Sequence, residues 1–175
     1  MRLAIVLGLA AGLLLAGCEA AGQEPPPASP TRTAPPTTAP GTPARTRPPA
    51  TVDAPCPYAS AATVMDIVGQ HIARTTVTST TPHPGCAFYR PNGEKAADLA
   101  VSVLASATAA RAEAIRLTGP GANPVDSVAD GGTVAITGDG ALLAVSKARA
   151  LVVVRSNQPV SLEAIELAKL VVARL

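Results

Sequence analysis

Aromatic residues and histidines are scarce in this 175-residue chain. It contains no Trp, one Phe, two Tyr and two His. A buried core must therefore be built from Val, Leu, Ile and Ala. The chain also lacks the patterns H-E-x-x-H, C-x-x-C and G-x-S-x-G, which mark common metalloprotease, thiol-redox and serine-hydrolase sites. We therefore predict a protein that is not an enzyme, with no catalytic residues, no metal site and no cofactor.

An excess of one charge sign is also missing. The whole chain has 14 Lys and Arg against 12 Asp and Glu, a formal net charge of +2. Between residues 54 and 175 we count ten Lys and Arg against nine Asp and Glu, and they form no basic stripe. Binding to nucleic acid depends on clustered cations that neutralise phosphates. The sequence therefore argues against a nucleic-acid partner.

The long apolar run of this chain lies at its start. Residues 3–15 follow Met1-Arg2 and are aliphatic, Gly or Ala, and the run closes with Leu15-Ala16-Gly17-Cys18. A positive start, an apolar centre and small residues define a secretory signal. The run is shorter than the roughly 20 residues of a transmembrane helix. One interpretation of this segment is an ordinary cleaved signal after which Cys18 has no special role.

The ending of this run is similar to the bacterial lipobox, in which a Cys is acylated and becomes the new N-terminus. The resemblance implies a signal peptide over residues 1–17 and lipidation of Cys18. Two or more acyl chains hold a protein stably on a bilayer. We therefore expect a lipid-anchored protein on the extracytoplasmic face of the cell membrane, with the membrane itself as one partner.

Proline is concentrated in one segment. Eleven of the 18 Pro lie between residues 19 and 55, together with Thr, Ala and a few Arg. Such a segment buries too little apolar surface to offset its ordering entropy. We predict that residues 18–53 form the lipidated Cys and a disordered linker, and that residues 54–175 form one globular domain.

Two cysteines remain after Cys18. Cys56 and Cys86 form an even pair in a domain predicted to be exported, which favours a disulfide. Closing a loop of about 30 residues stabilises a fold by roughly 3–4 kcal/mol in the chain-entropy account. A redox role is the weaker alternative because no C-x-x-C is present.

Local signals in the globular part predict three helices and six strands. Ser60 and Ser161 are good N-caps, Ser106 opens the second helix, and Gly-rich or Pro-rich turns separate the strands. We expect helices at 61–68, 106–117 and 162–174, and strands at 71–80, 86–90, 98–104, 133–136, 141–146 and 151–154. The fold class is therefore α+β, a single domain with helices packed on antiparallel sheet and the order α-βββ-α-βββ-α.

Two segments of the domain resemble a known family. Cys56-Pro57-Tyr58 and Cys86-Ala87-Phe88-Tyr89-Arg90-Pro91 are similar to segments of actinobacterial envelope lipoproteins that are known only as a domain of unknown function. The element order is also similar to PsbP/Mog1-like folds. The resemblance implies a lipid-anchored extracytoplasmic domain and brings no catalytic residues with it.

The aromatic residues gather near the predicted disulfide. We take Tyr58, His83, Tyr89 and Arg90 as a candidate binding surface, since an apolar wall with polar tips is typical of ligand sites. The alternative is that Tyr58 and Phe88 pack around the disulfide as core. Adjacent strand residues point to opposite faces, so Phe88 and Tyr89 do not share a pocket.

These observations favour a non-catalytic binding or adaptor protein of the cell envelope. Its partner would be an envelope protein, or a glycan or lipid ligand. The alternative is a small-ligand carrier or sensor, with a groove between the sheet and its helices. A hydrolase is the third and least favoured hypothesis because no catalytic constellation is present.

Overall fold

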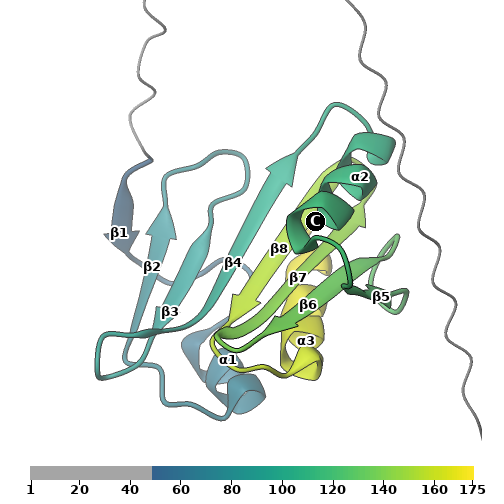
Figure 1. Ribbon diagram of the computed structural model, residues 1–175. Coiled ribbons are helices and arrows are strands. Elements are labelled where there is room, and N and C mark those ends of the chain that lie inside the picture. The colour runs from purple at the N-terminus through teal and green to yellow at the C-terminus, as the bar shows by residue number, and fades with distance from the viewer. Residues whose placement is uncertain (1–48) are drawn as a thin grey trace, which may run out of the picture. The chain divides into compact units, whose positions relative to one another are not determined.

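The computed structural model describes residues 49–175, which form an eight-stranded antiparallel sheet with three helices (Figure 1). The predicted signal peptide, Cys18 and the linker as far as residue 48 lie outside the described residues. The helices are α1 (Ala61–Val68), α2 (Ala107–Thr118) and α3 (Ser161–Val172). The strands are β1 (Thr51–Asp53), β2 (Arg74–Thr78), β3 (Cys86–Tyr89), β4 (Lys95–Val103), β5 (Asn123–Val125), β6 (Gly132–Thr137), β7 (Gly140–Lys147) and β8 (Ala150–Ser156).

The α+β class and the single domain are confirmed, and the element order needs two additions. The strands lie in the order β1-β2-β3-β4-β8-β7-β6-β5, so the apolar strand β8 is central. The additions are the two edge strands, β1 and β5, each of three residues. The sequence places residues 51–53 in the linker, whereas they form β1, so the sheet begins before residue 54. Such short edge strands depend on pairing with a neighbour, which a local pattern does not reveal.

Serine side chains cap two of the three helices. The Ser60 hydroxyl accepts a hydrogen bond from the Thr63 N–H at 3.0 Å, and the Ser106 hydroxyl accepts one from the Ala109 N–H at 3.1 Å. The prediction for α3 was wrong. Ser161 is the first residue of that helix, and Val160 occupies the cap position without a side-chain hydrogen bond.

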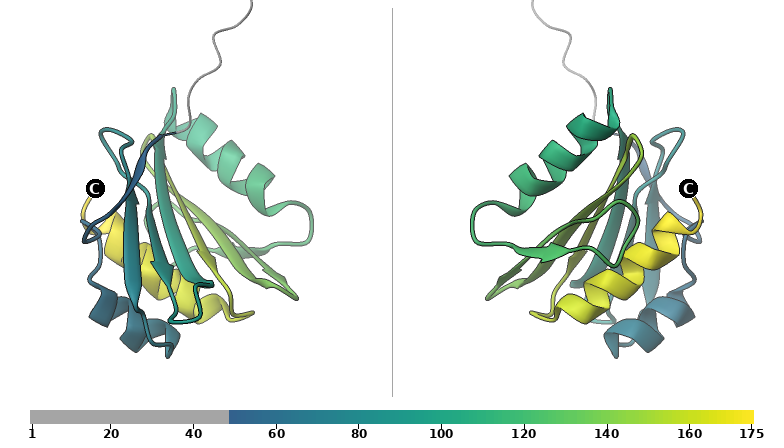
Figure 2. Two further views of the ribbon diagram at one scale, coloured as in Figure 1. Left: turned by 90° about the vertical axis from the view of Figure 1, so that its left-hand side faces the viewer. Right: turned by 90° about the vertical axis from the view of Figure 1, so that its right-hand side faces the viewer.

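The helices cover the two faces of the sheet unequally. α1 and α3 lie on one side of the sheet and α2 lies on the other (Figure 2). The layer between the sheet and α1 with α3 holds the larger core. It contains many side chains with no exposed surface. Among them are Phe88, Leu143, Val154, Leu167 and Val171.

α2 packs over a smaller apolar cluster on the opposite face. Ala114 of α2 contacts the cluster formed by Ala144, Leu151 and Val153 of β7 and β8. The small side chain of Ala114 lets the helix approach the sheet closely. As the scarcity of aromatics predicts, aliphatic side chains fill both layers.

The predicted disulfide is confirmed. Cys56 and Cys86 are bonded and both are buried, which joins the segment before α1 to the start of β3. The bond closes a loop with a sequence separation of 30 residues. Of the helices between residues 49 and 175, none has the length and apolar character that spanning a membrane requires.

Candidate functional site

One part of the sheet surface has no helix over it. α2 packs on β6, β7 and β8, and it leaves uncovered the same face of β1 to β4 and the adjoining end of β8 (Figures 1 and 2). We call this uncovered surface the open face. Since α1 and α3 occupy the other side of the sheet, a partner reaches the sheet most directly on the open face.

Strand pairing aligns a row of five residues across the open face, and all of them except Ala87 are polar. The pairs are Asp53 with Thr76, Thr76 with Ala87, Ala87 with Asp98, and Asp98 with Arg155. Paired residues point to the same face, and neighbouring strands lie about 4.8 Å apart. The row therefore runs for roughly 19 Å from β1 to β8.

A β-bulge adds a further charge to this face. Tyr89 pairs with Lys95, whereas Phe88 pairs with Ala97, so Ala96 is an extra residue in β4. Strict alternation would place Lys95 and Asp98 on opposite faces because they are three residues apart. The extra residue shifts the alternation and brings both to the open face.

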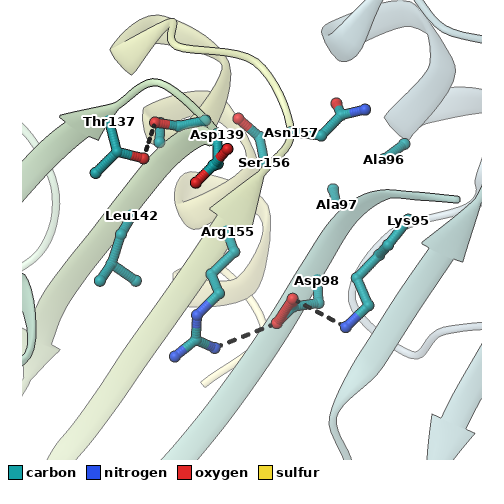
Figure 3. A pocket seen from close by; sticks show the side chains of 12 residues that line it. Lys95, Ala96, Ala97, Asp98, Thr137, Asp139, Leu142, Arg155, Ser156 and Asn157 are labelled. Carbon is teal, nitrogen blue, oxygen red and sulfur yellow. Dashed lines mark hydrogen bonds and ion pairs between the residues drawn. The ribbon is translucent and has the colours of Figure 1, made fainter.

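Two adjoining hollows follow these residues and share Lys95 and Asp98. Their volumes are about 270 and 230 Å³. Together they form what we call the open groove. The first hollow is lined by side chains from β4, β8 and the β6–β7 hairpin (Figure 3). The second is lined by residues that include Thr51, Thr76, Thr78, Tyr89 and Ala100.

Asp98 lies between two cations at the centre of the groove. Its carboxylate oxygens are 3.3 Å from Lys95 Nζ and 3.4 Å from Arg155 Nη1 (Figure 3). The Asp98 side chain is 17% exposed, whereas those of Lys95 and Arg155 are 46% and 52% exposed. An ammonium has three donors and a guanidinium has five, so both cations keep donors for a partner.

The β1–β3 end of the groove carries a second charged group. Arg74 lies over the Tyr89 ring, with its Cζ 4.5 Å from the ring centroid, and its Nη1 is 3.7 Å from Asp53 Oδ1. This stacking is a cation–π contact. It occupies one face of the Tyr89 ring, and that face is closed to stacking by a ligand.

The β6–β7 hairpin forms one wall of the groove. Gly140 has φ +141°, and a Cβ at this position would lie 1.9 Å from the Ser156 carbonyl oxygen. Only Gly permits this backbone contact with the end of β8. The contact holds the hairpin, and with it Asp139, beside Arg155 in the groove lining (Figure 3).

The structure separates the four residues of the predicted binding surface. Tyr58 is buried in the core, and its hydroxyl has no hydrogen-bond partner among the described residues. Burial raises the pKa of this Tyr58 hydroxyl. His83 lines a different hollow with Val101, Ser102 and Val103. The four residues therefore do not form one surface.

Tyr89 and Arg90 are neighbours in sequence but belong to different sites. Tyr89 lines the open groove, whereas Arg90 lies beyond the end of β3, pairs with Glu94 and lines another hollow. Phe88 is fully buried on the opposite face from Tyr89. The segment Cys86–Arg90 therefore contributes to the core, the groove and a separate pocket.

Sequence reasoning missed the charged centre of the groove. Lys95, Asp98 and Arg155 lie on two strands that are distant in sequence, and only the pairing of β4 with β8 brings them together. The alternation of apolar and polar residues in β4 places Asp98 on the polar face of the strand, which is a local signal for this site. Within residues 49–175 no group of three or more His, Cys, Asp or Glu side chains is arranged to hold a metal ion.

Comparison with known proteins gives a family without an assigned activity. No curated protein matches the chain significantly. Residues 38–175 match the family described as "Domain of unknown function (DUF2020)". This match covers all the described elements and most of the chain, and the chain therefore belongs to the DUF2020 family.

Proposed function

We propose that this protein is a lipid-anchored, non-catalytic adaptor of the cell envelope that binds a partner protein on its open face. The N-terminal sequence supports the anchor, because Leu15-Ala16-Gly17-Cys18 follows a short apolar signal. The similarity of the Cys56 and Cys86 segments to actinobacterial envelope lipoproteins supports the same location.

The observation that carries the binding proposal is the groove around Asp98. It is the part of the sheet left without a helix, and it presents Lys95 and Arg155 with unused donors. Alternating charges across an interface favour a partner of complementary charge and give specificity. The groove therefore fits the charged and polar surface of a protein.

Two features count against the other ligand classes. Sugars commonly stack on aromatic rings, but Arg74 already covers one face of Tyr89. A lipid requires an apolar cavity, and the layer between the sheet and α3 is filled by side chains such as Leu143 and Leu167. This packing gives no support to the alternative function, a carrier that holds a small ligand between the sheet and its helices.

Co-purification tests the binding role of the groove. Full-length protein is extracted from membranes with detergent, and its partners are identified by mass spectrometry. The double variant Lys95→Glu/Arg155→Glu is expected to lose the main partner, because both cations that flank Asp98 change sign. Retention of that partner by the variant would contradict the proposal.

A matched control is available on surfaces outside the groove. Arg116 of α2 and Lys169 of α3 are exposed, and their ion pairs within residues 49–175 are with Glu113 and Glu166 on their own helices. Arg116→Glu/Lys169→Glu changes the net charge by the same amount as the groove variant. This control is expected to keep the partner, which separates a local effect from one of net charge.

The anchor has its own test. Cys18→Ser removes the thiol to which the acyl chain would be attached, so the variant is expected in the medium or as an uncleaved precursor. Fractionation of cells into membrane and soluble parts measures this. If the variant and the wild type are found in the membrane fraction in equal proportion, lipidation of Cys18 is contradicted.

A further inference from the structure

The unpaired cations of the domain gather at one end of the sheet. Residues 49–175 contain ten Lys and Arg, and six of them form ion pairs with a carboxylate. The other four have no carboxylate within ion-pair distance among the described residues, and these four are Arg111, Lys147, Arg149 and Arg174. We call the end of the domain that carries them the cationic end.

The β7–β8 hairpin is the centre of the cationic end. It contributes Lys147 and Arg149, which donate hydrogen bonds of 2.9 Å to the backbone carbonyl oxygens of Val172 and Leu104, respectively. Val172 is the last residue of α3, so Arg174 also lies near the hairpin. Since a carbonyl group carries no net charge, these bonds orient the two cations without neutralising them.

The fourth cation comes from the opposite face of the sheet. Arg111 of α2 donates through Nη2 to the backbone carbonyl oxygen of Asp130 at 3.2 Å. The Asp130 carboxylate in turn accepts a hydrogen bond from the Ala148 N–H, in the same hairpin, at 2.6 Å. Since α2 and α3 lie on opposite sides of the sheet, cations flank the hairpin on both sides (Figure 2).

The unpaired carboxylates have a different distribution. Asp139 lies in the β6–β7 hairpin and Glu163 in the first turn of α3, both at the end of the sheet opposite to the cationic end. Asp66 lines the same hollow as Glu163. Asp126 and Asp130 lie in the connection from β5 to β6, near the cationic end, where four cations thus outnumber two carboxylates. The charge of the domain is therefore polarised along the strands.

The chain enters the domain at the cationic end. The antiparallel pairing of β1 to β4 places Thr51, the first residue of β1, at the same end of the sheet as Val103, the last residue of β4 (Figure 1). Val103 pairs with Ala150, which also pairs with Lys147, and the Val103 side chain is 50% exposed. Since the proposed lipid anchor precedes β1 in sequence, the cationic end is the end that the tether reaches.

We propose that the cationic end docks the domain onto the anionic phosphate headgroups of the bilayer. Lys and Arg donors suit phosphate oxygens, and an anionic surface attracts cations within about one Debye length, roughly 10 Å. The exposed Val103 side chain lies among these cations and can enter the apolar boundary of the headgroup layer. The unpaired carboxylates at the other end are repelled by the same surface.

Tethering favours a lipid surface over a soluble polyanion of the same charge. An anchored domain meets the bilayer at a high effective concentration, so even weak attraction holds it there. Docking of this end leaves Lys95, near the opposite end of β4, free to meet a partner. The inference rests on the anchor of the proposed function but does not involve the open groove.

The absence of tryptophan from the chain makes the docking measurable. Val103→Trp places one tryptophan at the cationic end, and Leu162→Trp places one at the other end, where Leu162 is 68% exposed. Full-length protein purified from membranes is reconstituted into vesicles of phosphatidylcholine with brominated acyl chains, with or without phosphatidylglycerol. Bromine quenches tryptophan fluorescence at short range, so quenching reports contact of each end with the bilayer.

The two tryptophan positions are expected to respond differently. Quenching of Val103→Trp should be on the order of tenfold stronger on the vesicles that contain phosphatidylglycerol than on the neutral ones. Leu162→Trp should show no such difference. Salt at about 1 M should remove most of the quenching of Val103→Trp, because it shortens the Debye length to about 3 Å.

Charge reversals make the test specific. Arg149→Glu/Arg174→Glu reverses two exposed cations of the cationic end and should abolish the extra quenching of Val103→Trp on anionic vesicles. The groove variant Lys95→Glu/Arg155→Glu changes the net charge equally and should keep that quenching. Flotation with neutral vesicles reports the lipid anchor separately. Failure of the anchor, of the groove and of this docking are therefore distinguishable.

Three results would overturn the proposal. The first is equal quenching of Val103→Trp on neutral and anionic vesicles. The second is unchanged quenching of Val103→Trp when Arg149→Glu/Arg174→Glu is also present. The third is loss of the quenching when duplex DNA is added at the same phosphate concentration as the lipid, which would assign the cations to a soluble polyanion.

Discussion

Lys95 and Asp98 are three residues apart in β4, yet both side chains lie on the open face, with Lys95 Nζ 3.3 Å from Asp98 Oδ1. The bulge at Ala96 causes this arrangement because it shifts the alternation of the strand by one residue. Arg155 reaches the same carboxylate from the neighbouring strand. The groove's charged centre is thus a product of strand register.

Removing the central carboxylate is expected to have little effect on folding. Asp98→Asn breaks two ion pairs whose cations are about half exposed, so we expect a loss of about 1 kcal/mol or less in the free energy of unfolding. Urea denaturation measures this, and the loss should shrink in about 1 M salt, which screens such pairs. A loss well above about 2 kcal/mol would assign Asp98 a structural role.

The hairpin wall of the groove depends on Gly140. Gly140→Ala places a methyl group against the Ser156 carbonyl oxygen at a positive φ, and we expect a loss of about 2–4 kcal/mol in stability. Gly138→Ala in the same turn is the control, because its added Cβ would meet nothing within 4 Å. Thermal unfolding compares the two variants, and similar melting temperatures for both would contradict this role of Gly140.

The disulfide is expected to contribute strongly to stability. Cys56→Ser/Cys86→Ser removes the cross-link between residues that are 30 apart in sequence, so the unfolded chain gains conformational entropy. The chain-entropy account predicts a loss of roughly 3–4 kcal/mol in the free energy of unfolding. Guanidinium denaturation with and without reductant measures it. In the native wild type both cysteines should resist alkylation until they are reduced, and rapid alkylation would refute the bond.

Glu163 is expected to make the stability depend on pH. Burial raises the pKa of its carboxyl above the ordinary value of 4.5. The folded state therefore holds this proton more tightly than the unfolded state, and the associated stability is lost as the pH rises through the folded-state pKa. Glu163→Gln removes the titration.

The test is to compare unfolding of wild type and Glu163→Gln by urea at several pH values from 4 upward. The stability of the variant relative to the wild type should increase over the window that begins near pH 4.5 and extends above it. Glu166→Gln, at an exposed position of the same helix, is the control for the loss of one carboxylate. A constant difference between wild type and Glu163→Gln across this range would contradict the raised pKa.

The features predicted well from sequence are those with local causes. Ser60 sets the start of α1 because an N-cap acts within one turn of helix, and in the structure the left-handed Gly69 ends that helix. The turn at Gly138-Asp139 likewise sets the β6–β7 hairpin. The prediction that Ser161 caps α3 was wrong. The preceding residue, Val160, has the extended conformation of the cap position, and the helix begins at Ser161.

The features that sequence reasoning missed depend on distant parts of the chain. β1 exists through its pairing with β2, and the charged centre exists through the pairing of β4 with β8. Tyr58, His83, Tyr89 and Arg90 are close in the sequence pattern, but the fold buries Tyr58 and places the other three in three different hollows. No local pattern reveals that Ala96 is a bulge, and without it Lys95 cannot be placed.

Site-specific photo-crosslinking in living cells tests the adaptor role of the open face most directly. A photoreactive phenylalanine analogue replaces Tyr89 in the groove or, as a control, Glu166 on the exposed side of α3. The account predicts that the analogue at position 89 crosslinks one dominant protein and that the analogue at position 166 does not crosslink this protein. The crosslink from position 89 should disappear when Lys95→Glu/Arg155→Glu is also present. Equal crosslinking from both positions, or no crosslinked protein from position 89, would contradict the account.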